Sequence, residues 1–102
     1  MAGRSGTFEG LNDVFNGSVT SVGIPYTIGG TFDKPVPPFY VPDAKYSEGA
    51  PVDSRIHGYV GPDELYLEFE SNKATITGKL ASSIGHKFGF TGYAQILAQL
   101  PI

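Results

Sequence analysis

The segment ELYLEFESNKATITGKL, residues 64–80, decides the fold class of this chain. Apolar and polar side chains alternate on either side of Ser71-Asn72, and a period of two is typical of strands with one buried face. A turn at Ser71-Asn72 sets opposite charges across both ends of the ladder, which favours one register. The predicted cross-strand pairs are Glu64–Lys79, Tyr66–Thr77, Glu68–Thr75 and Glu70–Lys73. The segment therefore predicts an antiparallel hairpin.

Similar alternation extends over most of the remaining chain, and no segment has a sustained helical period. Asn12-Asp13 predicts a turn, and Asn16-Gly17 predicts a bulge or a second turn. Seven to eight short strands predict an all-β antiparallel domain, and glycines inside the strand patterns favour a small β-barrel over a β-sandwich. The expected strands are residues 7–11, 14–24, 24–33, 52–60, 64–70, 73–80 and 87–96, with 94–100 fitting a strand better than a helical turn.

The core is predicted from the apolar positions of these alternating segments. It lies mostly in the second half of the chain, where the alternation is cleanest. The predicted core residues are Ile56, Val60, Leu65, Leu67, Phe69, Ile76, Leu80, Phe88 and Phe90.

Composition limits the functions that the chain can have. Its 102 residues make one domain, and without cysteine there is no disulfide, thiolate nucleophile or zinc–thiolate site. A net charge of −3, with no run of Lys or Arg, argues against nucleic-acid binding, and no apolar stretch is long enough to span a membrane as a helix. We expect no metal and no cofactor. Residues 1–6 lack a signal sequence, so we expect them to be flexible and the protein to be cytoplasmic, although export of a processed form stays open.

Residues 34–51, KPVPPFYVPDAKYSEGAP, differ from the rest of the chain. They hold five of the eight prolines and little periodicity, which predicts a long, extended, Pro-rich loop. Such loops in small domains are often functional, and this one carries the aromatic residues Phe39, Tyr40 and Tyr46. We expect these three side chains to bind a ligand or to cap an open end of the core.

Several ionisable side chains lie in the predicted strand that follows this loop in the chain. Asp53, Arg55, His57 and Tyr59 alternate along one strand and so share a face. Under the predicted loop, Arg55 would hold an anionic or carbonyl group, Tyr59 would donate a hydrogen bond and His57 would transfer a proton. The same row also fits the solvated face of a half-buried strand. His86 is a further candidate base at the barrel mouth, or a histidine at a strand end with a structural role.

These features together favour a non-enzymatic binding or interaction module that self-associates. Its partner would be a small molecule or a protein, and the exposed tyrosines and the aromatic loop are the basis of this prediction. The first alternative is a small-barrel enzyme or carrier for an apolar or carbonyl-containing ligand, with isomerase, cyclase or hydrolase chemistry. The second is a structural subunit of a phage or secretion assembly.

Overall fold

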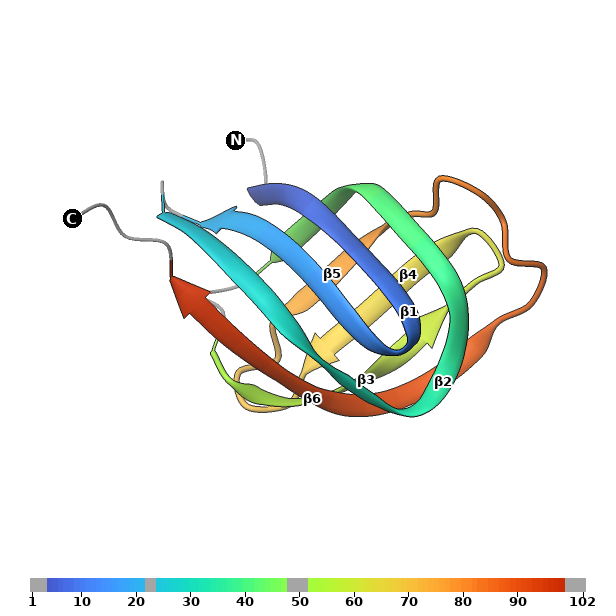
Figure 1. Cartoon of the computed structure of the whole chain (residues 1–102). Coiled ribbons are helices and arrows are strands. Elements are labelled where there is room, and N and C mark those ends of the chain that lie inside the picture. The colour runs from blue at the N-terminus through green and yellow to red at the C-terminus, as the bar shows by residue number, and fades with distance from the viewer. Residues whose placement is uncertain (1–3, 22–23, 48–51, 99–102) are drawn as a thin grey trace.

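A computed structural model describes residues 4–21, 24–47 and 52–98, and these form an all-β fold of six antiparallel strands (Figure 1). No helix in these ranges is long and apolar enough to cross a membrane. The strands are β1 (Arg4–Ser21), β2 (Ile24–Ser47), β3 (Ser54–Val60), β4 (Glu64–Phe69), β5 (Thr75–Lys79) and β6 (Phe88–Ala98).

Five of these strands close into a barrel, which confirms the predicted fold class. The ring runs β2-β5-β4-β3-β6 and returns to β2, because β2 is long enough to pair at both of its ends. Residues 26–32 of β2 pair with β6, and residues 45–47 pair with β5. The extra strand, β1, pairs with β2 along nearly all of its length.

The strand count is six, and the prediction of seven to eight was wrong because β1 and β2 each bend without ending. The expected turn at Asn12-Asp13 lies inside β1, where Asn12 takes a positive φ of 59° and the register with β2 shifts on both sides. Figure 1 shows β1 bent back on itself inside the bend of β2. The two halves of β1 lie so close that a Cβ on Gly6 would overlap the Ser18 carbonyl. Residues 4–6, expected to be flexible, belong to β1, whereas residues 1–3 lie outside the described residues.

The Pro-rich loop predicted for residues 34–51 is also a correction. Residues 34–47 continue β2, and residues 48–51 lie outside the described part of the chain. Between Phe32 and Lys45 this strand has a ladder partner, β1, along one edge only. Proline is tolerated at such an edge because its missing N–H removes no ladder hydrogen bond. Register shifts in the β1–β2 ladder accommodate the irregular backbone.

The second half of the chain follows the predicted pattern. β4 and β5 pair Glu64 with Lys79, Tyr66 with Thr77 and Glu68 with Thr75, and β6 continues as a strand to Ala98. Residues 70–73 form a four-residue turn, closed by hydrogen bonds from Phe69 N to Ala74 O (2.8 Å) and from Lys73 N to Phe69 O (2.9 Å). Glu70 and Lys73 therefore lie in the turn and not in the ladder.

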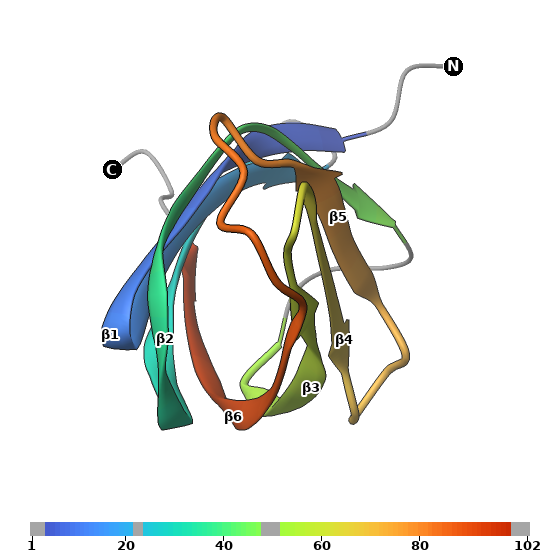
Figure 2. The ribbon, with the colours of Figure 1, turned by 90° about the vertical axis from the view of Figure 1, so that its right-hand side faces the viewer.

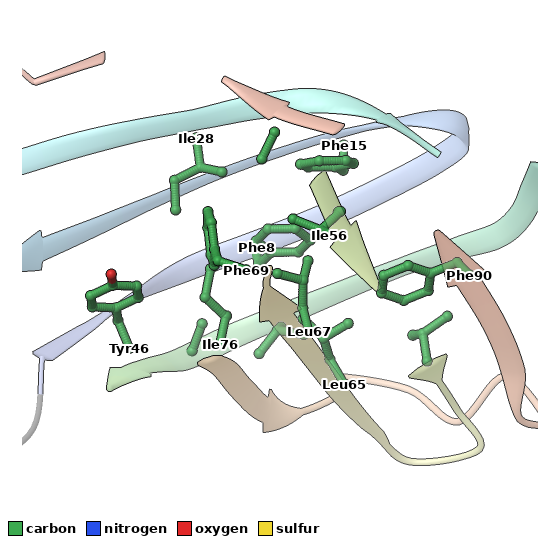
Figure 3. Close-up of a cluster of buried hydrophobic side chains, with 14 of the residues drawn as sticks. Phe8, Phe15, Ile28, Tyr46, Ile56, Leu65, Leu67, Phe69, Ile76 and Phe90 are labelled. Atoms are coloured by element: carbon green, nitrogen blue, oxygen red, sulfur yellow. The ribbon is translucent and has the colours of Figure 1, made fainter. Parts of the chain in front are cut away.

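The core fills the barrel with side chains from both halves of the chain (Figure 3). Seven of the nine predicted core residues are buried, and the other two, Leu80 and Phe88, are half-buried against the cluster. The prediction missed the large contribution of β1 and β2. That contribution consists of Phe8, Phe15, Val19, Ile28, Phe32, Val36, Phe39, Val41, Ala44 and Tyr46.

Candidate functional site

The barrel has a cavity at one end, here called the mouth pocket, with a volume of about 550 Å³. Its walls are the bend of β1 (residues 9–11 and 14–16), residues 38–40 of β2 and residues 81–84 of the loop between β5 and β6. Figure 2 shows this loop running across the open end of the barrel. The pocket therefore lies between the bend of the N-terminal strands and a crossing loop.

The mouth pocket is mainly apolar. Phe15 and Phe39 line its inner part and belong to the buried core. Leu11, Val14 and Tyr40 line its outer part with 54%, 44% and 43% of their surface exposed. They are three of the six large hydrophobic residues that are exposed in the described part of the chain. Half of these exposed hydrophobic residues therefore lie around one cavity.

Backbone hydrogen bonds hold the crossing loop in place. Ala81 N donates to Tyr40 O (2.8 Å), and Ile84 N donates to Pro62 O (3.0 Å). The Ile84 side chain also packs against the core. The loop wall of the pocket is therefore fixed without a ligand, as in most small-molecule sites.

The polar groups of the pocket are few. The side chains that carry them are those of Glu9 and Asn16 of β1, Tyr40 of β2, and Ser82 and Ser83 of the loop. Among the described residues that line the pocket, Glu9 carries the single charged side chain. The lining therefore suits an apolar body with one or two hydrogen-bonding groups, and it disfavours an anion.

The predicted polar row lies on the outer face of the barrel from Arg55 on, and its first member, Asp53, precedes β3 and accepts a hydrogen bond from Ile96 N at 2.7 Å. The Arg55 guanidinium forms an ion pair with Asp33 of β2 at 2.9 Å, and the Thr91 hydroxyl of β6 donates to the same carboxylate at 2.6 Å. The hydrogen bond from Thr91, followed by that from Arg55, holds the pKa of Asp33 below its usual range. Arg55 is thus engaged with Asp33 and aligned away from the mouth pocket.

His57 and Tyr59 have acidic partners on the same outer face. His57 Nδ1 lies 3.1 Å from Glu70 Oε2, and its Nε2 lies 3.8 Å from Glu68 Oε1. The Tyr59 hydroxyl donates to Glu64 at 2.9 Å, and this hydrogen bond raises the pKa of Tyr59. Each of these two side chains is therefore held in a fixed orientation above the sheet.

A second hollow, here called the outer groove, has a volume of about 530 Å³ and lies beside these side chains. Tyr59 and Tyr66 form one wall, with ring centroids 5.7 Å apart and nearly parallel planes. The Tyr66 hydroxyl donates to Glu68 at 2.8 Å, which raises the pKa of Tyr66. The Lys87 ammonium lies 4.2 Å from the centre of the Tyr59 ring. An ordered aromatic wall with a cation against it thus borders the groove.

The structure divides the predicted site between three places. Phe39 and Tyr40 line the mouth pocket, whereas Tyr46 is buried in the core. Arg55, His57 and Tyr59 lie on the outer face, and the aromatic residues of β2 do not close over them. This follows from β2 continuing as a strand, because its ladder with β1 holds residues 36–46 in the barrel wall. Ligand binding by these residues stays a prediction.

The remaining candidate, His86, is exposed on the loop between β5 and β6. Its ring packs edge-on against Phe88, with centroids 6.3 Å apart. It is absent from the described lining of both hollows. No three His, Asp or Glu side chains of the described ranges are placed together as metal ligands would be.

Sequence reasoning missed several residues that shape the two hollows. Leu11, Val14 and Ile84 contribute apolar surface to the mouth pocket, and Gly89 and Tyr66 contribute to the outer groove. One usable signal was the pair Val14-Phe15, where two adjacent apolar residues break the alternation and one of them must face outward. The break marked a bend with an exposed apolar side chain.

Comparison with family models, with curated proteins and with solved structures finds no match to this chain.

Proposed function

We propose that the protein is a non-enzymatic binding module that takes a small, uncharged, largely apolar ligand in the mouth pocket. The observation that carries this proposal is the gathering of Leu11, Val14 and Tyr40 around a cavity of about 550 Å³. Small-molecule sites have volumes of roughly 300–1,000 Å³ and mostly apolar walls. Exposed apolar side chains that cluster, in contrast to scattered ones, commonly mark a binding site.

The polar lining supports binding more than it supports a reaction. Ser82 and Ser83 lie in the exposed loop, and no histidine or lysine accompanies them among the described lining residues. A serine nucleophile needs an adjacent base, and Glu9 is the single carboxylate among the described lining residues. We infer that these groups orient a ligand through hydrogen bonds, as do the few polar groups of carrier sites.

The test is an NMR titration of the full chain with 2-naphthamide, a neutral ligand with two apolar rings. We expect amide shifts at Gly10 and Val14 in the bend of β1 and at Ile84 in the crossing loop. Leu11→Ser removes apolar surface that the bound ring would cover, which costs about 1 kcal/mol, or roughly 5-fold in affinity. Leu97→Ser is the matched control, because Leu97 is 64% exposed and lies on β6 outside the described lining.

The two serine variants separate a specific site from general stickiness. An affinity that falls with Leu11→Ser and is unchanged with Leu97→Ser supports the proposal. Equal losses in both variants, or shifts spread over the whole surface, would contradict it. Self-association, which the sequence predicts, stays a prediction beside this proposal.

A further inference from the structure

We infer a second, independent binding site: the outer groove takes a planar organic anion, with an aromatic body lying over Gly89 and its anionic group facing Lys34. The groove lies between β2, β3, β4 and β6 on the outside of the barrel. It shares no described lining residue with the mouth pocket. Binding at one site can therefore be tested independently of binding at the other.

The first argument comes from the glycines. At eight of the described glycines an added Cβ would overlap neighbouring atoms, and Gly85 has a positive φ, so the fold itself requires them. Gly29 and Gly89 are the two that remain, and a Cβ on Gly89 would find its nearest neighbour, the Gly58 carbonyl oxygen, 3.9 Å away. Glycine weakens a strand, so a glycine that packing does not need often marks close approach by another molecule.

Gly89 lies where such a molecule would rest. It pairs with Tyr59 across the β3–β6 ladder and faces outward, because its neighbour Phe90 is buried. Without a side chain at this position, the backbone forms part of the floor of the groove beside the Tyr59 and Tyr66 rings. A flat ring can therefore lie on the backbone with its edge against the aromatic wall, an arrangement that favours aromatic ligands.

The second argument comes from charge. The groove is lined by Lys34 and His57 and, among its described lining residues, by no Asp or Glu. The carboxylate next to Lys34 in the chain, Asp33, is engaged by Arg55 at 2.9 Å and by Thr91 at 2.6 Å. No described ion pair includes Lys34, so its positive charge is uncompensated at the groove.

The glutamates near the groove on the outer face also have contacts with neighbouring side chains. Glu64 accepts from the Tyr59 hydroxyl, Glu68 accepts from the Tyr66 hydroxyl, and Glu70 lies 3.1 Å from His57. None of these three glutamates is among the described lining residues of the groove. The ammonium of Lys87, 4.2 Å from the Tyr59 ring centre, adds a further cation near the groove. A hydrogen bond from a tyrosine hydroxyl leaves a carboxylate its charge, so the preference for an anion comes from Lys34, which carries the single fixed charge among the described lining residues.

The experiment compares 2-naphthoate with 2-naphthamide, which have nearly the same shape and differ in charge. Both are titrated into the full chain while NMR follows the amides of Lys34, His57, Gly89 and Thr91. A ligand of this size binds with a Kd on the order of 1 mM at ordinary affinity per atom. We expect 2-naphthoate to shift these amides with about 5-fold higher affinity than 2-naphthamide, because one screened charge pair contributes that much.

Three variants test the assignment. Lys34→Gln lowers the affinity of the groove for 2-naphthoate about 5-fold and leaves 2-naphthamide binding unchanged. Gly89→Val fills the floor and abolishes binding of both ligands at the groove. Gly29→Val is the matched control, since Gly29 is the other glycine with room for a Cβ (3.6 Å to Asn16 Oδ1) and is absent from the groove lining. The melting temperatures of the two valine variants confirm that both are folded.

Other results would overturn the inference. These are equal affinities for the two ligands at the groove amides, full binding by Gly89→Val, or an absence of shifts at these amides at millimolar ligand. The mouth pocket is followed in the same spectra through Gly10, Val14 and Ile84. Failure of one site is therefore distinguished from failure of the other.

Discussion

The mouth pocket and the outer groove have nearly the same volume, about 550 and about 530 Å³, and charged lining residues of opposite sign. The mouth pocket is cut into the hydrophobic core, so its inner wall consists of side chains that the fold must bury, such as Phe15 and Phe39. The outer groove lies on the solvent face of the sheet, and its wall is ordered by hydrogen bonds between exposed tyrosines and glutamates. Core packing therefore forms the walls of the mouth pocket, and surface hydrogen bonds order the wall of the outer groove.

This contrast teaches how a barrel of about 100 residues can present two kinds of site. Alternation along each strand sends one set of side chains inward and the other outward. A bend that opens the core exposes apolar surface, whereas a missing outward side chain leaves a hollow beside the aromatic and charged side chains of the outer face. The charged lining residues follow the same division, with Glu9 at the mouth and Lys34 at the groove.

The largest expected effect concerns stability. Phe39→Ala removes a ring that is 6% exposed and lies 6.1 Å from the Phe8 ring centre, so we expect a loss of about 3–5 kcal/mol. Tyr40→Ala at the exposed edge of the pocket, and Tyr59→Ala in the groove, should each cost no more than about 1 kcal/mol. Urea unfolding of the three variants measures this. Similar losses in all three would show that the two hollows are built alike.

A smaller effect concerns charge selectivity at the mouth. Glu9→Gln removes the carboxylate from the pocket lining, and we expect the affinity of the mouth for 2-naphthoate to rise about 5-fold. Binding at the groove should not change, because Glu9 is absent from its lining. NMR titration reads both sites in one experiment. An unchanged affinity at the mouth would mean that Glu9 does not set its selectivity.

The smallest expected effect concerns the stability of the fold at acidic pH. The pKa of Asp33 is lowered by Thr91 and Arg55 in the folded chain, so its contribution to stability is present above the ordinary Asp pKa of about 3.9. That contribution is lost as the pH falls through the lower folded value. Thr91→Val should move the pKa of Asp33 back towards its usual range, as carbon-detected NMR of the carboxyl group would show. The effect on unfolding is small because the carboxylate is half exposed.

Asp33→Asn is the control for this prediction, because it removes the carboxyl group whose pKa is shifted. Asp33→Asn should remove the difference in acid stability between the wild type and Thr91→Val, since the shifted group is then absent. If the difference persists, another group is responsible for the acid dependence on this face.

The candidate site was only partly predictable. Phe39 and Tyr40 were identified from their place in an aromatic, Pro-rich segment, and both line the mouth pocket. Their expected neighbours Arg55, His57 and Tyr59 lie on the other side of the barrel wall. Identifying residues by type and nearness in the chain could not show this, because the direction of a side chain depends on whether its segment is a strand or a loop.

What the sequence determined by itself is the local pairing of residues 64–80. There the polar–apolar alternation and the opposed charges of Glu64 and Lys79 favour the register that the structure has, although the turn spans residues 70–73 and the predicted pair Glu70–Lys73 does not form. The path of β1 and β2, in contrast, depends on the tertiary structure. Their bends depend on contacts between residues distant in the chain, such as Gly6 against Ser18, and on closure of β2 onto both β5 and β6. A period of two describes which face a residue takes along one strand, and it carries no information on where that strand bends or which edge it meets.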